Sequence, residues 1–568
     1  MMKKIQQSGN IAFFILLALL LVTFIPFLGE AWFNSKGEPR EAIVAVSMLQ
    51  QHNWILPLSN GDVMPYKPPC LAWFIALFSM VTGHVTEFTS RLPSALALIG
   101  MTLWMFLFFA HRTSRLTAFL GSVITFTAFE VYRAGFACRV DMLLTFFIVG
   151  ALLSLYTYWE RELRGIPWLA VLMMSGAALT KGPVGIILPC LVMWIFMLAE
   201  RVKLWEATWK LALCAVAALI IPSLWYIAAY QQGGSEFIRL AMEENFGRMT
   251  GTMSYESHVN PFWYNFITVF AGYTPIIILC LISLPFLFIK KLWSPDSVRT
   301  WWQQFKTLDA PRKFALITIV VIFVFYCIPK SKRSVYLLPI YPFIALFLAE
   351  YILFIAHRAQ KAIKIYAWVL GVAAIAIFAT FIVIRCGAFP TSIFHGKHAG
   401  ENIRMIASLD KALPAIKWFL IEIPVIAAVA LFLLRKRLSP TANVMGVLAL
   451  TVTLYWAFAG VYQPAVLNAK SDRPVAELLN RLQPEGDIYA HVSADMLKFF
   501  TIDFYTDDRI KPIESTEATS GYFIIGVEDA RTFLPENADK YHFFLKKHFN
   551  RRSCDTKQDI LLLRFVKK

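Results

Sequence analysis

The sequence predicts an α-helical polytopic membrane protein with about thirteen transmembrane helices and a small C-terminal α/β domain. Of its 568 residues, 58% are hydrophobic and only 16% are charged, whereas a soluble chain usually carries about 25% charged residues. The apolar residues form runs close to the roughly 20 residues that cross a bilayer core as a helix. The basic residues behind the net charge of +17 form short clusters between these runs, which is typical of membrane topology, so we expect no nucleic-acid partner.

The first apolar run, 11–30, follows Lys3 and Lys4 and lacks a small-residue cleavage site. It therefore predicts a signal anchor that stays in the membrane rather than a removed signal peptide. The further runs of suitable length cover 92–110, 116–132, 142–158, 168–180, 184–199, 210–230, 262–289, 314–328, 334–356, 365–385, 416–434 and 441–463.

The apolar stretch 70–82 is short for a span and predicts an interfacial or re-entrant segment on the outer side. If it does not cross, nearly every dense basic cluster falls in a cytoplasmic loop, as the positive-inside rule requires. These clusters are Arg112/Arg115, Arg161/Arg164, Arg201/Lys203, 290–313, Arg358/Lys361/Lys364 and 435–437. If 70–82 crossed, all later loops would invert and the rule would fail repeatedly.

This topology divides the chain into a transmembrane domain, 1–465, and a soluble C-terminal domain, 466–568. The transmembrane domain includes a first outer loop, 31–91, with juxtamembrane helices. The C-terminal domain lies outside and combines an amphipathic stretch, 474–482, with strand-like runs at 487–491, 522–527 and 560–565.

Three groups of charged residues stand on the outer side near span ends, where charges are costly without partners. They are 36–41, with Glu38, Arg40 and Glu41; Arg133 with 139–141; and 330–333, with Lys330, Lys332 and Arg333. Glu41, just after Pro39, and Asp141, at a helix start, also have a plain explanation as first-turn or capping residues.

The cations of 330–333 break the positive-inside rule and predict an anion site, because Lys and Arg hold phosphate by charge and forked hydrogen bonds. Lys67, Arg91, Lys181 and Arg248 lie at the same depth. Carboxylates beside such a site indicate a lipid-linked phosphate substrate. The cations would stabilise a phosphate leaving group while a carboxylate orients or deprotonates an acceptor hydroxyl.

At these residues the chain resembles the GT-C glycosyltransferases related to protein O-mannosyltransferases, and most closely the bacterial lipid A aminoarabinose transferases. The resemblance runs from about residue 10 to 345 and depends on the order of several short motifs. They are Gly37-Glu38-Pro39-Arg40, Trp54-Ile55-Leu56-Pro57, Lys67-Pro68-Pro69, Arg91-Leu92-Pro93-Ser94, Arg139-Val140-Asp141-Met142, Thr180-Lys181-Gly182-Pro183, 244–248 with His258 and 261–264, and 332–339.

The resemblance implies a bacterial inner-membrane enzyme that moves a sugar from a polyprenyl (undecaprenyl) phosphate to a lipid A-like glycolipid or other surface glycan, with its active site and C-terminal domain in the periplasm. Membrane lipids would be its other partners. Donor phosphate would bind to Lys67, Lys330, Lys332, Arg333, Lys181 and Arg248, with Arg40, Arg139, Tyr336 and His258 in support.

Two positions depart from the family pattern. Gly37 stands where the family carries the Asp of an Asp-Glu pair, so the catalytic acid would be Glu38 or Asp141. Tyr66 stands where relatives carry a glutamate before Lys-Pro-Pro. The motifs establish no cofactor, and a divalent metal near His258 stays open.

Two other classes of function compete with this interpretation. A transporter or flippase of lipid-linked glycans would also have many spans, but it should place polar residues along a path at mid-membrane depth. The predicted spans are nearly free of charges. A scaffold that binds a partner through its tail gives no reason for the charged outer loops.

Overall fold

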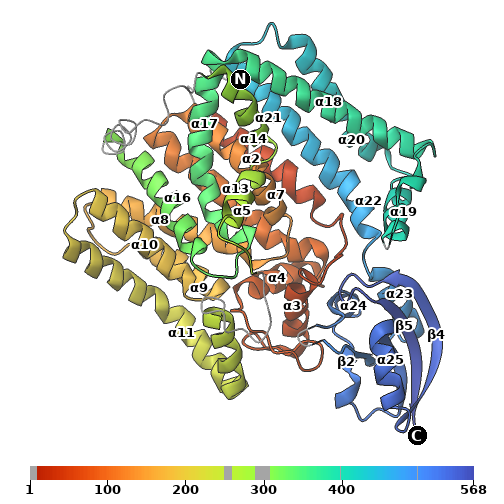
Figure 1. The fold of residues 1–568 in the computed structure, drawn as a ribbon. Coiled ribbons are helices and arrows are strands. Elements are labelled where there is room, and N and C mark those ends of the chain that lie inside the picture. The colour runs from red at the N-terminus through yellow and green to blue at the C-terminus, as the bar shows by residue number, and fades with distance from the viewer. Residues whose placement is uncertain (1–8, 248–258, 288–306, 397, 495–496) are drawn as a thin grey trace.

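The structure is a computed structural model that describes residues 9–247, 259–287, 307–396, 398–494 and 497–568. Helices form most of the molecule, and the C-terminal sheet domain lies at one end of the helical body beside helix α3 (Figure 1). The predicted class, a polytopic helical membrane protein with a small C-terminal α/β domain, is confirmed.

Within the described residues, nine helical segments are long and apolar enough to cross a membrane. They are Gly9–Phe27, Glu87–Arg112 (α5), Val140–Glu160 (α8), Leu204–Asn245 (containing α11, Leu204–Met242), Ala310–Cys327 (α16), Ser334–Arg358 (η4, Ser334–Ile340, and α17, Tyr341–Arg358), Gln360–Arg385 (α18), Ala415–Leu434 (α20) and Pro440–Asn468 (containing α21, Pro440–Ala457, and α22, Gln463–Asn468).

A tenth candidate is the pair Tyr264–Gly272 (α13) and Ile276–Phe286, which bends by 100° between its two helices. Four apolar helices are shorter: Cys70–Thr82 (α4), Arg115–Thr127 (α6), Trp168–Lys181 (α9) and Val184–Ala199 (α10). Each predicted run overlaps one of these segments. The count of thirteen spans, which leaves α4 on the outer side, stays a prediction.

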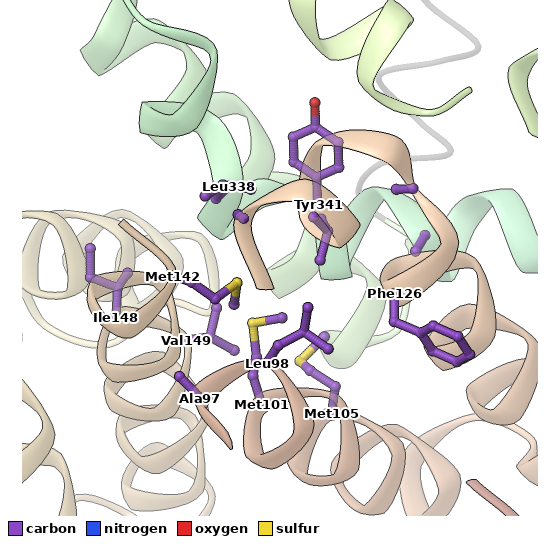
Figure 2. Close-up of a cluster of buried hydrophobic side chains, with 14 of the residues drawn as sticks. Ala97, Leu98, Met101, Met105, Phe126, Met142, Ile148, Val149, Leu338 and Tyr341 are labelled. Atoms are coloured by element: carbon purple, nitrogen blue, oxygen red, sulfur yellow. The ribbon is translucent and has the colours of Figure 1, made fainter. Parts of the chain in front are cut away.

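The centre of the bundle is built from α5, α6, α8 and α17. Leu98, Met101 and Met105 of α5 lie close to side chains of α8 and α17, among them Met142 and Tyr341, in a buried cluster (Figure 2). Helix α8 is buried around most of its circumference, as expected for a helix that is hydrophobic on all sides and surrounded by others. Its first turn carries Asp141, so the core fixes that carboxylate in place.

Two short helices shape the first outer loop. Helix α3, Pro39–Gln51, begins at a proline, which suits the first turn because the missing N–H has no helical partner there. It ends at His52, whose φ of 52° is left-handed. Helix α4 begins directly after Pro68 and Pro69, and α3 packs against it. The loop between them carries Tyr66 and Lys67.

The C-terminal domain contains a five-stranded sheet of order β2-β1-β3-β5-β4. Its strands are β1 Ile488–His491, β2 Ile510–Pro512, β3 Ser520–Gly526, β4 Tyr541–Arg552 and β5 Asp559–Lys567. The first three are parallel and β5 runs antiparallel to both β3 and β4. Helices α23 (Arg473–Leu482) and α24 (Phe500–Tyr505) contribute to the apolar core on one face, and α25 (Val527–Glu536) to the core on the other.

The C-terminal domain docks on the first outer loop through α24, which packs against α3. The Tyr505 hydroxyl donates to Glu87 Oε1 at 2.6 Å and accepts from the Phe33 N–H at 3.0 Å. Nearby, Asp508 accepts from the Ser47 hydroxyl at 2.8 Å and from the Asn60 N–H at 2.7 Å. These buried or partly buried bonds join segments more than 400 residues apart and hold the domain over α3.

Tyr505→Phe is expected to loosen this docking, because it leaves the Glu87 carboxylate and the Phe33 N–H without their shared hydroxyl while keeping the ring. An unsatisfied buried group costs about 1–3 kcal/mol. We expect faster limited proteolysis between the membrane domain and the C-terminal domain. Tyr541→Phe is the matched control, since the Tyr541 hydroxyl makes no hydrogen bond with the described residues. Equal proteolysis of the two variants would contradict the assigned docking role.

Candidate active site

Glu38 is held in place on both of its oxygens. Arg91 Nε donates to Glu38 Oε1 at 2.8 Å and Arg91 Nη2 donates to Oε2 at 3.0 Å. The Cys138 N–H adds a bond to Oε1 at 2.9 Å. Arg91 also donates to the carbonyls of Leu28 and Ala31 and is only 4% exposed. Arg91 is therefore committed to protein groups and does not belong to the anion-binding set.

Glu41 forms a second acid–cation pair. Its carboxylate forms an ion pair with the Lys67 ammonium across 26 residues of sequence, and Arg40 approaches the same oxygen to 3.6 Å. Arg40 and Lys67 also lie 5.7 and 5.8 Å from the centre of the Tyr66 ring. Glu41 does lie in the first turn of α3, as the capping explanation requires, but its carboxylate is engaged with Lys67.

Asp141 forms the third pair. Lys181, at the end of α9, donates to Asp141 Oδ1 at 2.6 Å. The Lys181 ammonium also lies 4.3 Å from the centre of the Tyr336 ring, a cation–π contact. The predicted residues Asp141, Lys181 and Tyr336 therefore meet, although they come from three different helical segments.

The basic segment 330–333 contains a buried cation, Lys332, that has no counterion in the part of the chain that the structure describes. Lys332 is 5% exposed, and among the described residues its ammonium bonds only to the Pro329 carbonyl, at 2.6 Å. The backbone carbonyls of Lys330 and Lys332 accept hydrogen bonds from Asn260. Arg333 is half-buried, and Lys330 is exposed. A buried ammonium with one neutral partner is costly, which favours an anionic ligand here.

The three pairs and the basic segment share one electrostatic region. Lys67 and Arg333 both act on the charge of Asp141. The predicted donor-site cations Lys67, Lys181 and Arg333 are thus brought together around Asp141. Arg248 and His258 lie outside the described residues.

Position 37 has no side chain, and Arg139 fills the space beside it. A Cβ placed on Gly37 would lie 1.6 Å from a guanidinium nitrogen of Arg139. The Arg139 guanidinium makes no hydrogen bond or ion pair within the described ranges, but its charge acts on both Glu38 and Glu41. In this chain a cation therefore occupies the space that a side chain at position 37 would need.

The site opens into a cavity of about 310 Å³ between the first outer loop, the end of α11 and the C-terminal domain. Arg40, Glu41 and Lys67 line its charged part, and Lys498 and Phe500 come from the C-terminal domain. Apolar side chains line the rest, including Val44, Met48, Ile55, Leu71 and Leu240. A ligand with a charged head and apolar surface fits such a lining. No motif or charge pattern in the sequence pointed to Lys498 or Phe500.

Burial and charge set the protonation of these groups. Burial raises the pKa of Glu38 and of Glu41, but the surrounding cations, chiefly Arg91 for Glu38 and Lys67 for Glu41, hold both pKa values below the usual range. Burial lowers the pKa of Lys67 to about 8, even though Glu41 favours its charged form. Both acids are ionised at neutral pH, and Lys67 titrates just above it.

The residues around Tyr66 do not fit a divalent metal. Arg40 and Lys67 surround the ring, and cations of this kind oppose metal binding. Among the described residues, the only three acidic, histidine or cysteine side chains grouped closely enough for a metal are Asp472, Cys554 and Asp555, in the C-terminal domain.

Comparison with known proteins agrees with this geometry. The family model described as dolichyl-phosphate-mannose-protein mannosyltransferase matches residues 66–226, which include Lys67, Asp141 and Lys181. The fold is similar to the crystal structure of ArnT from Cupriavidus metallidurans bound to undecaprenyl phosphate. The TM-score is 0.71 at 17% identity, over 96% of this chain and 97% of that one.

Three relatives show the sequence similarity. The undecaprenyl phosphate-alpha-4-amino-4-deoxy-L-arabinose arabinosyl transferase of Pectobacterium carotovorum subsp. carotovorum is 25% identical over 406 residues, 70% of this chain and 68% of that protein. The protein of the same name from Shewanella sediminis is 24% identical over 368 residues, which cover 63% of each chain. An uncharacterized protein of Aquifex aeolicus is 25% identical over 66% of this chain and 71% of its own.

Fold and site together define a multi-pass membrane glycosyltransferase of the GT-C class. Within that class, the chain is similar to the protein mannosyltransferases and the aminoarabinose transferases.

Proposed function

We propose that the protein transfers a sugar from an undecaprenyl phosphate donor to a lipid A-like glycolipid or another surface glycan, on the outer face of the bacterial inner membrane. The observation that carries the proposal is the pairing of Lys67 with Glu41 on a cavity wall. Charged side chains line one part of this cavity, and apolar side chains line the rest. The named relatives act on this kind of donor.

Each cation has a role in this proposal. Lys67, Lys181, Lys332 and Arg333 bind the donor phosphate and stabilise its charge as the bond to the sugar breaks. Lys330 and Arg248 complete this set, and Arg40, Arg139, Tyr336 and His258 support it. Preorganised cations are effective because they need no rearrangement when the phosphate leaves.

The carboxylates hold these cations. Glu38, through Arg91 and the Cys138 N–H, fixes the start of α3, and Asp141 holds Lys181. Both stay candidates for the carboxylate that stabilises positive charge at the anomeric carbon.

The proposal is tested by deleting the gene and comparing surface glycolipids by mass spectrometry. We expect one glycolipid to lose the mass of a single sugar, with the modification restored by the wild-type gene. Purified protein should then transfer the sugar from an undecaprenyl phosphate donor. Unchanged glycolipids and no transfer in vitro would overturn the proposal.

Donor binding is expected to weaken as the pH rises through about 8, the pKa of Lys67. The ammonium is charged below this pH and neutral above it, while a phosphodiester donor keeps one negative charge throughout. Affinity should fall by up to tenfold per pH unit above 8, until the pKa that Lys67 has with donor bound is reached. The measurement is a binding titration from pH 7 to 9.5. Lys67→Arg should remove the dependence, because guanidinium stays charged; the same slope in this variant would contradict the assignment.

The outer location of the site is tested by labelling single cysteines with a membrane-impermeant thiol reagent. His84→Cys, after α4, and Glu517→Cys, in the C-terminal domain, are both exposed and should react from the periplasmic side. Arg164→Cys, in a predicted cytoplasmic loop, should react only after permeabilisation. The background is Cys386→Ser, since Cys386 is exposed. Labelling of positions 84 and 517 from opposite sides would contradict the topology.

A further inference from the structure

Glu41 is the buried carboxylate of the cavity. Three acids line this cavity, but Asp62 and Glu236 are more than half exposed at its rim, whereas the Glu41 side chain is 10% exposed. Glu38 and Asp141 are not among the residues that line the cavity in the described part of the chain. A ligand bound inside the cavity would therefore have the Glu41 carboxylate beside it.

Glu38 is poorly placed to accept a proton. Its two oxygens take two bonds from Arg91 and one from the Cys138 N–H. Protonation would leave the buried guanidinium of Arg91 without its counterion, which is strongly unfavourable. Position 37 offers no acid, and Arg139 fills the space there. The Glu41 carboxylate has one hydrogen bond to give up in the described part of the chain, whereas that of Glu38 has three.

Among the described residues, Lys67 alone donates a hydrogen bond to the Glu41 carboxylate, and Lys67 is also a cation of the proposed donor site. A donor phosphate and Glu41 therefore compete for one ammonium. Lys67 lies on a loop between Pro65 and Pro68 at the cavity wall, and a charge-assisted bond to phosphate can replace its bond to a carboxylate.

We propose that Glu41 is the catalytic base, released when Lys67 binds the donor phosphate and then free to take the proton of the acceptor hydroxyl. This inference rests on the proposed function. Glu41 would thus be free to act as a base only while the donor is bound. Proton removal from the acceptor is then restricted to a site that holds a donor.

The step balances as a single displacement. The acceptor O–H gives its proton to a Glu41 oxygen while the acceptor oxygen forms a bond to the anomeric carbon. The bond from that carbon to the phosphate oxygen breaks, and its electron pair leaves with the polyprenyl phosphate, beside Lys67. Glu41 then returns its proton to water or to the departing phosphate.

Electrostatics agrees with this sequence of events. Burial raises the pKa of Glu41, and among the groups that offset burial Lys67 acts most strongly, followed by Arg40. Transfer of Lys67 to a phosphate removes the strongest of these influences, so the pKa of Glu41 rises and the carboxylate becomes a better base. Arg40 and Arg139 remain nearby and keep it ionised until the acceptor arrives.

The test compares Glu41→Gln, Glu41→Asp and wild type in two measurements on the full-length protein: binding of undecaprenyl phosphate and single-turnover sugar transfer. Glu41→Gln should bind undecaprenyl phosphate at least as tightly as wild type, because Lys67 is freed, but transfer sugar about 100-fold more slowly or worse. Glu41→Asp should keep measurable transfer. Glu517→Gln, an exposed acid in the C-terminal domain, is the control with unchanged rates.

The other outcomes would overturn either the role of Glu41 as base or the proposed function. Transfer by Glu41→Gln within threefold of wild type overturns the role of Glu41 as base. Parallel loss of binding and transfer also overturns it, because Glu41 would then only position Lys67. Wild-type protein that transfers no sugar from undecaprenyl phosphate donors overturns the proposed function, and with it this inference.

Discussion

Lys67→Ala is expected to reduce sugar transfer by roughly 100- to 1,000-fold, the usual effect of removing one preorganised group that stabilises developing negative charge. The variant removes the ammonium that pairs with Glu41 and lines the cavity. Both the donor phosphate and Glu41 would lose their shared cation. The measurement is the initial rate of transfer by purified protein, normalised to the amount of folded protein in the membrane fraction.

Two variants separate loss of the charge from other effects. Lys36→Ala removes an exposed cation from the same loop and should leave the rate within twofold of wild type. Lys67→Arg keeps the charge but not the compact ammonium, so we expect partial activity. If Lys67→Ala retained half of the wild-type rate, Lys67 would not contact the leaving phosphate.

The helical part of the fold was predictable because the lengths of apolar runs and the positions of basic clusters determine membrane topology. Run length and charge identified every span candidate, and 70–82 forms the short helix α4. In the C-terminal domain, the predicted runs at 487–491, 522–527 and 560–565 coincide with β1, β3 and β5. These strands are buried and apolar, as central strands usually are.

Strand β4, Tyr541–Arg552, escaped prediction for a physical reason. It is one of the two edge strands of the sheet, largely exposed, and rich in Lys, His and Arg. Charges on an edge strand discourage pairing with other chains, but they also remove the alternation of apolar and polar residues that identifies a strand. The three-residue strand β2 is too short to give any such pattern.

The charged residues of the site were predictable from the sequence, but the ion pairs that they form were not. Glu38, Lys67, Asp141 and Lys181 stand out because charges near span ends need partners. Which acid meets which cation depends on how helices 26 to 53 residues apart in sequence pack together. Arg91 was therefore grouped with the phosphate-binding cations, although its donors go to Glu38 and to two carbonyls.

Glu41 illustrates the same limit. Its position after Pro39 is typical of a first-turn acid, and nothing in the local sequence distinguishes that role from a place in the cavity. Only the turn of the loop through Tyr66 and Lys67, back toward α3, gives Glu41 its partner. The specific chemistry of the site is thus a property of tertiary packing.

Arg91→Ala is expected to be the most destabilising single substitution in the first outer loop. It leaves the Glu38 carboxylate buried without its cation and removes the donors to the Leu28 and Ala31 carbonyls. Loss of one partner from a buried ion pair costs about 3–5 kcal/mol. The measurement is thermal unfolding of the detergent-purified protein, and most of the variant should fail to elute as a folded monodisperse species.

A series of variants assigns this loss to the buried pair. Arg164→Ala breaks an ion pair whose side chains are 80% and 73% exposed, and it should change stability by less than about 1 kcal/mol. Arg91→Lys keeps the charge but loses the two-pronged contact, so its stability should be intermediate. Replacing Glu38 with Leu and Arg91 with Met together should recover part of the loss, because no lone buried charge remains. An Arg91→Ala variant as stable as Arg164→Ala would show that the pair does not hold the first outer loop.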